Sequence, residues 1–164
     1  HMQIAIQLEV EGMPSFRKYG GYSVYSEGWA LYSETLPKEI GLYKDPYSDF
    51  GRLSGELWRA CRLVVDTGIH HYRWTREEGI DYYMNNTANP EGDCVGMVER
   101  HIVWPGQAVS YKIGMLKMQE LRAYAESTLG DNFSIQAFHD IVLKNGAVPM
   151  DILQDIVVQW VENQ

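Results

Sequence analysis

The sequence has little cysteine, no excess of positive charge and no long apolar run. Its two cysteines, Cys61 and Cys94, are too few for a disulfide framework and lack CxxC spacing, so we expect two small buried side chains. No apolar stretch approaches the roughly 18 residues of a membrane span, and no signal-peptide pattern opens the chain. With 14 Lys and Arg against 22 Asp and Glu, the net charge of −8 argues against general nucleic-acid or anionic-membrane binding.

Familiar catalytic signatures are also missing. The chain has no HExxH motif, P-loop, GxSxG elbow or dinucleotide fingerprint, which excludes a self-contained zinc site of the HExxH kind. It has no internal repeat and no alternating pattern typical of strands. What it does have is 164 residues, 45% of them hydrophobic and 12% aromatic, which is enough for one ordinary domain with a buried core.

Helical periodicity dominates the chain. It predicts helices over residues 1–8, 23–34, 50–67, 75–84, 105–129, 134–145 and from Pro149 onward, with a short helix or irregular segment at 95–103. Gly68 is expected to stop one helix, Pro105 to begin the long one, and Thr75 with Glu78 to form a capping box. The predicted fold is therefore all-α: an irregular bundle of about seven or eight helices over residues 1–164, without an internal boundary, as a single domain or part of one.

Two glutamates form the first candidate site. Glu27 and Glu34 are seven residues apart, so they share one face of the predicted helix 23–34. Carboxylates on an otherwise apolar face are costly unless they are paired or bind a metal. The alternative is structural, with one carboxylate exposed at a helix end and the other in a salt bridge.

Two further candidates lie at predicted helix ends. His70, in the segment 66–71, can donate to an oxyanion, bind a metal or interact with a helix C-terminus through its charge. Tyr111, in the segment 105–111, can donate to a developing negative charge or satisfy its hydroxyl locally. Each signal taken separately is weak.

Together, these segments resemble the bacterial "domain of unknown function 885" family, whose members look like zinc metallopeptidases of the gluzincin type. The residues that carry the resemblance are 27–32 with Glu34, 63–70, 74–77, Glu99-Arg100, 105–108 with Ser110-Tyr111 and Gly114, 138–140, and Trp160. His101 departs from the pattern, which has an aromatic residue such as Tyr there. The chain also lacks the family's HE-x-x-Pro-Gly-His-His segment, of which only the last His corresponds to His1. His1-Met2 is equally the common remnant of a cloning site.

The resemblance implies roles for five residues. Glu27 would be the third zinc ligand and His1 the one remaining imidazole ligand, while His70 and Tyr111 would stabilise the oxyanion of a hydrolysed peptide bond. Glu34 would support the site or the structure.

The missing segment makes this chain the expected C-terminal part of a larger catalytic domain. Zinc and a peptide substrate would belong to the intact protein, and the upstream half of the domain would be this chain's partner. With too few ligands, the chain alone would bind zinc weakly and be inactive, and its uncovered apolar face would favour self-association. Cytoplasm and envelope both remain open. The alternatives are a non-catalytic helical scaffold or interaction module, or a metal-free ligand-binding bundle.

Overall fold

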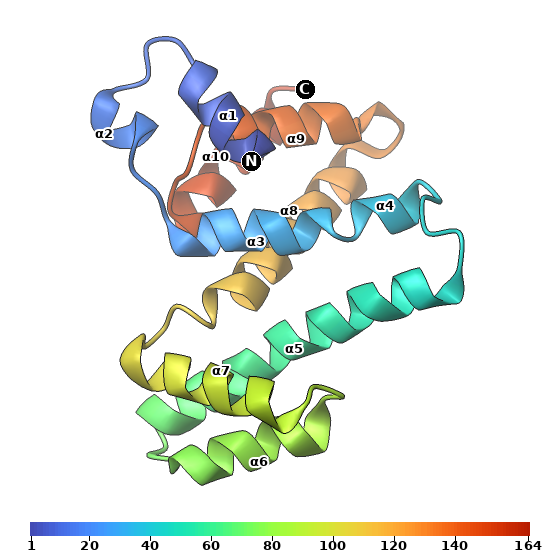
Figure 1. The fold of residues 1–164 in the computed structure, drawn as a ribbon. Helices are drawn as coiled ribbons and strands as arrows, with labels where there is room; N and C mark the ends of the chain where they lie inside the picture. Colours follow the sequence, from blue (N-terminus) through green and yellow to red (C-terminus); the bar gives the residue numbers. More distant parts are fainter. The chain divides into compact units, whose positions relative to one another are not determined.

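The computed structural model describes residues 1–164, and all of its regular secondary structure is helical, as predicted (Figure 1). Its elements are α1 (Met2–Glu9), α2 (Ser15–Lys18), α3 (Ser23–Ser33), α4 (Leu36–Glu39), α5 (Pro46–His70), α6 (Arg76–Asn86), α7 (Glu91–Val103), α8 (Ser110–Leu129), the 3-10 turn η1 (Gly130–Asn132), α9 (Ile135–Lys144) and α10 (Met150–Glu162). Eight of these α-helices have eight residues or more, while α2 and α4 are single turns. No helix is both long enough and apolar enough to cross a membrane.

The chain forms two compact units. Unit 1 combines His1–Ala30 with Gly114–Gln164, and unit 2 is the continuous segment Leu31–Ile113. The borders between the units fall inside α3 and α8. The expectation of one helical domain over residues 1–164, without an internal boundary, stays a prediction.

The core of unit 2 lies among α5, α6 and α7 (Figure 1). Its buried residues are Trp58, Cys61, Val65, Ile80, Tyr83, Cys94 and Val98. Both cysteines are free thiols inside this unit, as predicted, and burial raises the pKa of each thiol. They therefore behave as small apolar side chains rather than as nucleophiles.

Helix α5 extends beyond the predicted helix 50–67 at both ends, and Pro46 lies in its first turn, a position that suits proline. It begins at Pro46, where the Asp45 side chain accepts a hydrogen bond from the Ser48 backbone N–H at 3.0 Å. It then continues through Gly68 to His70, so the prediction that Gly68 stops the helix is wrong. A Cβ atom at Gly68 would lie 2.5 Å from the Trp74 indole. The glycine makes room for a ring packed against the helix rather than ending it.

Helix α8 begins later than predicted. It starts at Ser110, and residues 105–109 form turns instead of a first helical turn led by Pro105. Gly106 has a φ of 79°, in the left-handed region that a right-handed helix cannot contain. The prediction for Pro105 is therefore wrong, and the tight turn at Gly106 is the reason.

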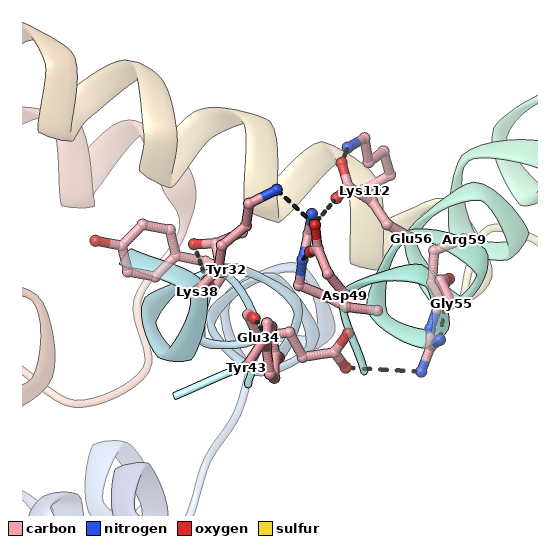
Figure 2. A network of polar contacts seen from close by, with 11 residues as sticks. Tyr32, Glu34, Lys38, Tyr43, Asp49, Gly55, Glu56, Arg59 and Lys112 are labelled. Atoms are coloured by element: carbon pink, nitrogen blue, oxygen red, sulfur yellow. Dashed lines mark hydrogen bonds and ion pairs between the residues drawn. The ribbon is translucent and has the colours of Figure 1, made fainter. Parts of the chain in front are cut away.

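One face of α5 is apolar and exposed. Phe50, Leu53, Leu57 and Val64 are spaced by three, four and seven residues, so they share a face, and each is at least 37% exposed. The buried face of this helix carries Trp58, Cys61 and Val65. Ion pairs lie close by, including Lys38 with Asp49 and Lys112 with Glu56 (Figure 2).

Unit 1 is built around α9, which packs against α1 and α10. Its fully buried side chains include Tyr25, Phe138, Val142, Leu153 and Val157. The Tyr25 hydroxyl donates to the Val142 carbonyl at 2.6 Å, and burial raises the pKa of this phenol. The hydrogen bond gives the buried hydroxyl a partner and connects α3 to α9.

Two glycines bring α3 and α8 into backbone contact within unit 1. A Cβ atom at Gly28 would lie 2.5 Å from the Gly114 Cα, and one at Gly114 would lie 2.0 Å from the Val24 carbonyl oxygen. Both distances are far below van der Waals contact, so only glycine fits at either position.

Candidate functional site

The His70 side chain is held at the C-terminal end of α5. Its Nε2 atom lies 2.8 Å from the backbone carbonyl oxygen of His101 on α7. A carbonyl oxygen can only accept, so Nε2 carries the proton and donates. In the neutral ring Nδ1 then has a lone pair, and it can donate a hydrogen bond only when the ring is protonated.

His101 itself is buried between α6 and α7. Its Nε2 atom shares a hydrogen bond of 2.7 Å with the Tyr83 hydroxyl, and the side chain is 1% exposed. Burial, reinforced by the positive charges of Arg62 and Arg100, lowers the pKa of His101 to about 4. The same burial raises the pKa of Tyr83. At neutral pH both groups are therefore uncharged, and His101 connects His70 to the core through its backbone and its ring.

Asp66 connects the segment that contains His70 with the segment that contains Tyr111. It lies on α5, one turn before His70, and it is only 4% exposed. Both of its carboxylate oxygens lie 3.2 Å from the backbone N–H of Gly106. This contact holds the 105–109 turn against α5 and so places the start of α8, including Tyr111, near the end of α5.

Tyr111 lies beneath a buried cation. The Arg62 guanidinium carbon is 4.6 Å from the centre of the Tyr111 ring, a cation–π distance. Burial lowers the pKa of Arg62 from its usual value, and its Nε atom is buried without a hydrogen-bond partner. The Gln107 side-chain amide donates to the Tyr111 hydroxyl at 3.3 Å. The hydroxyl thus accepts from Gln107, and its own proton is left to donate.

The first candidate pair divides between the two units. Glu27 is half-buried on α3 in unit 1, whereas Glu34 belongs to unit 2. The Glu34 carboxylate faces the guanidinium of Arg59 at 3.9 Å, and its backbone carbonyl accepts from the Tyr43 hydroxyl at 3.0 Å (Figure 2). The supporting role that the resemblance implies for Glu34 stays a prediction.

The residues of this chain do not form a complete metal site. His1 is exposed and immediately precedes α1 in unit 1. No group of three or more His, Cys, Asp or Glu side chains is arranged to hold a metal ion. A catalytic zinc ion needs three protein ligands, so the ligands present here are insufficient by themselves. The assignments of Glu27 and His1 as ligands stay predictions, as do the roles of His70 and Tyr111.

Sequence reasoning missed the residues that organise this site. The sequence analysis singled out His101 only because an aromatic residue is expected at that position. It did not single out Arg62 or Tyr83. An aromatic residue at 101 would suit the surroundings, because the ring lies 6.0 Å from that of Tyr83. The only available signal for Arg62 was its spacing, since it lies one turn before Asp66 on the same helix.

Comparison with known proteins identifies the family. The sequence profile described as "bacterial protein of unknown function (DUF885)" matches residues 1–157. The chain belongs to this family. Its description assigns no activity, and no functionally curated protein sequence matches the chain.

A solved structure shows the same fold. It is described as "the putative lipoprotein from Colwellia psychrerythraea", and it is 51% identical to this chain with a TM-score of 0.98. The match covers 100% of this chain but 28% of that one. This chain therefore spans 28% of the length of that relative, which contains this fold within a considerably longer polypeptide.

Proposed function

We propose that this chain is the C-terminal part of a bacterial zinc-dependent peptidase. In the intact protein, Glu27 supplies one carboxylate ligand to zinc, whose chemistry is to activate water and polarise a carbonyl. The other ligands and the general base come from the rest of the polypeptide. His70 and Tyr111 donate hydrogen bonds to the oxyanion that forms when a peptide bond is attacked.

The observation that carries this proposal is the hydrogen bond from His70 to the His101 carbonyl. It fixes the ring at the end of α5 through Nε2 and leaves Nδ1 to another partner. A protonated His70 can then donate from Nδ1 to an oxyanion while Nε2 stays bound to the protein. Fixing one ring nitrogen in this way orients the other nitrogen before substrate arrives.

Tyr111 supports the proposal through its hydroxyl. Gln107 donates to the oxygen, and the Arg62 guanidinium lies over the ring, so both neighbours polarise the hydroxyl. A hydroxyl polarised in this way is a better donor to a developing oxyanion.

The test uses the intact protein expressed from the source gene. Glu27→Gln should lose bound zinc and peptidase activity together. His70→Gln and Tyr111→Phe should retain zinc and lose about 10²- to 10³-fold in kcat, the usual cost of removing one oxyanion donor. Glu120→Gln, an exposed carboxylate on α8 that is ion-paired with Lys117, is the control and should change neither property. Full zinc content and activity in Glu27→Gln would contradict the ligand assignment.

The alternative is a non-catalytic helical scaffold. It is favoured by the absence of any complete metal-binding group among residues 1–164. The coding sequence upstream of residue 1 separates the two functions. An in-frame HE-x-x-Pro-Gly-His segment supports the peptidase, whereas an upstream region without it favours the scaffold.

A further inference from the structure

A pocket lies in unit 1, formed by segments that the proposed catalytic roles do not use. It is a pocket of about 630 Å³ between the 16–22 segment and the loop that leads from α9 into α10. This volume lies within the range of small-molecule and peptide-residue sites. Most of its wall is apolar, with Phe16, Tyr22, Val148, Ile152 and Ile156 among the lining residues.

The pocket is rigidly built by one buried side chain. Gln7 is 7% exposed, and its amide nitrogen lies 2.8 to 3.1 Å from the backbone carbonyls of Arg17, Lys18 and Gly20. Its amide oxygen accepts from the Ala147 backbone N–H at 3.0 Å. Gln7 therefore fixes the two walls of the pocket to one another. A pocket held in this way loses little entropy when a ligand binds.

The only charged residue in the pocket wall is Arg17. Its Nη2 atom donates to the Asn145 carbonyl at 2.6 Å, which holds the guanidinium at the wall. No carboxylate lines the pocket to neutralise it, although the chain carries a net charge of −8. A guanidinium has five N–H donors in a planar fork, so donors remain after the bond to Asn145.

An apolar wall with one fixed cation selects an apolar group that carries an anion. We propose that the pocket binds the C-terminal residue of a peptide with an apolar side chain. The side chain lies against Ile152 and Ile156, and the carboxylate binds Arg17 through charge-assisted hydrogen bonds. Peptide as the ligand class rests on the proposed function, whereas the pocket and its charge do not.

The experiment titrates the ¹⁵N-labelled 164-residue chain with N-acetyl-Ala-Ala-Phe and follows the backbone amide signals. The free acid should shift the signals of Gly20, Gly21 and Ala147, which line the pocket. The C-terminal amide of the same peptide should bind about tenfold more weakly, because it lacks the charge that Arg17 recognises. Equal affinity of acid and amide, or shifts confined to other residues, would overturn the proposal.

Two variants separate charge recognition from apolar burial. Arg17→Gln should lower the affinity for the free-acid peptide by about tenfold and leave the affinity for the peptide amide unchanged. Lys18→Gln is the control. It removes a neighbouring charge outside the pocket wall and should change neither affinity. Ile152→Trp should fill the pocket and abolish binding of both peptides. This variant keeps the test decisive if Arg17→Gln does not fold. Retained binding in Ile152→Trp would overturn the proposal.

An apolar group with a carboxylate can come from a peptide C-terminus or from a free aliphatic acid, and a titration with octanoate distinguishes the two. If it binds as tightly as the peptide acid and shifts the same amides, the ligand is a free aliphatic acid and the assignment to a peptide end is wrong. Weaker binding of octanoate supports the peptide. The titration contains no zinc, so its failure would leave the ligand role of Glu27 untouched, and loss of that role would leave the pocket untouched.

Discussion

Asp66 places both of its carboxylate oxygens 3.2 Å from the backbone nitrogen of Gly106, forty residues later in the chain. The left-handed turn at Gly106 presents its N–H to the carboxylate. Through this contact the end of α5 and the start of α8 are held together, and these are the segments that carry His70 and Tyr111. The candidate site thus depends on a bond between two residues that are not themselves expected to touch a substrate.

Asp66→Ala should lower the free energy of unfolding by about 2 kcal/mol, because the Gly106 N–H is left without its acceptor. Asp66→Asn keeps one acceptor oxygen and should cost less. Asp140→Ala is the control, since its carboxylate is 60% exposed and pairs only with Lys144 one turn away. Urea unfolding measures all three. Equal losses for Asp66→Ala and Asp140→Ala would show that the Gly106 contact adds no stability.

His101 should make the protein less stable in mild acid. Its folded pKa of about 4 lies below the unfolded value of 6.5, so the unfolded chain binds more protons between these values. Stability from this group is complete above pH 6.5 and is lost as the pH falls, by about 2 kcal/mol at pH 5.

The measurement compares the pH dependence of urea unfolding with that of His101→Gln. Glutamine can still accept from Tyr83 but does not titrate, so the difference between the two curves isolates His101. Parallel curves between pH 4 and 7 would contradict the buried neutral histidine.

Gly114→Ala should destabilise the chain by about 1 to 3 kcal/mol, because the added methyl group would overlap the Val24 carbonyl oxygen. Gly96→Ala is the matched control. It lies on exposed α7 surface with nothing within 4 Å of the added carbon, so alanine should stabilise that helix by about 0.5 to 1 kcal/mol. Thermal and urea unfolding should therefore move in opposite directions for the two variants.

The exposed apolar face of α5 should make the 164-residue chain self-associate. Sedimentation velocity over a range of concentrations should show growing oligomers, because this face otherwise remains in contact with water. Leu53→Glu combined with Leu57→Glu should shift the equilibrium towards monomer. Ile40→Glu, on a more exposed apolar residue outside α5, should not. A concentration-independent monomer would contradict the prediction.

The sequence predicts the parts of this fold that local chemistry determines. The Thr75–Glu78 capping box is confirmed, and so are the helix starts at Ser134 and Pro149, which the structure shows as N-cap residues. Each depends on side chains and backbone groups within one helical turn. The predictions for Gly68 and Pro105 are wrong because the packing of Trp74 against Gly68 and the turn at Gly106 determine the structure there. Neither could be inferred from spacing along the chain.

The candidate site likewise divides into residues that local sequence predicts and residues that only tertiary packing reveals. Local sequence patterns and a family resemblance singled out His70 and Tyr111, because their motifs are continuous segments. The residues that orient them could not be predicted from the sequence, because the burial of Arg62 and His101 follows from how α5, α6 and α7 pack. An arginine in the middle of a helix is usually exposed, and only the tertiary structure places its Nε atom out of reach of water.

The hydrogen bond between Gln7 and Ala147 joins residues separated by 140 positions. During synthesis, all of Leu31–Ile113 is added to the chain before Ala147. Unit 2 can therefore complete its contacts while the nascent N-terminal segment still lacks the loop that Gln7 requires. The order of translation thus makes unit 1 the last part of this chain to mature, and it leaves α1 without its C-terminal partner until most of the chain has been synthesised.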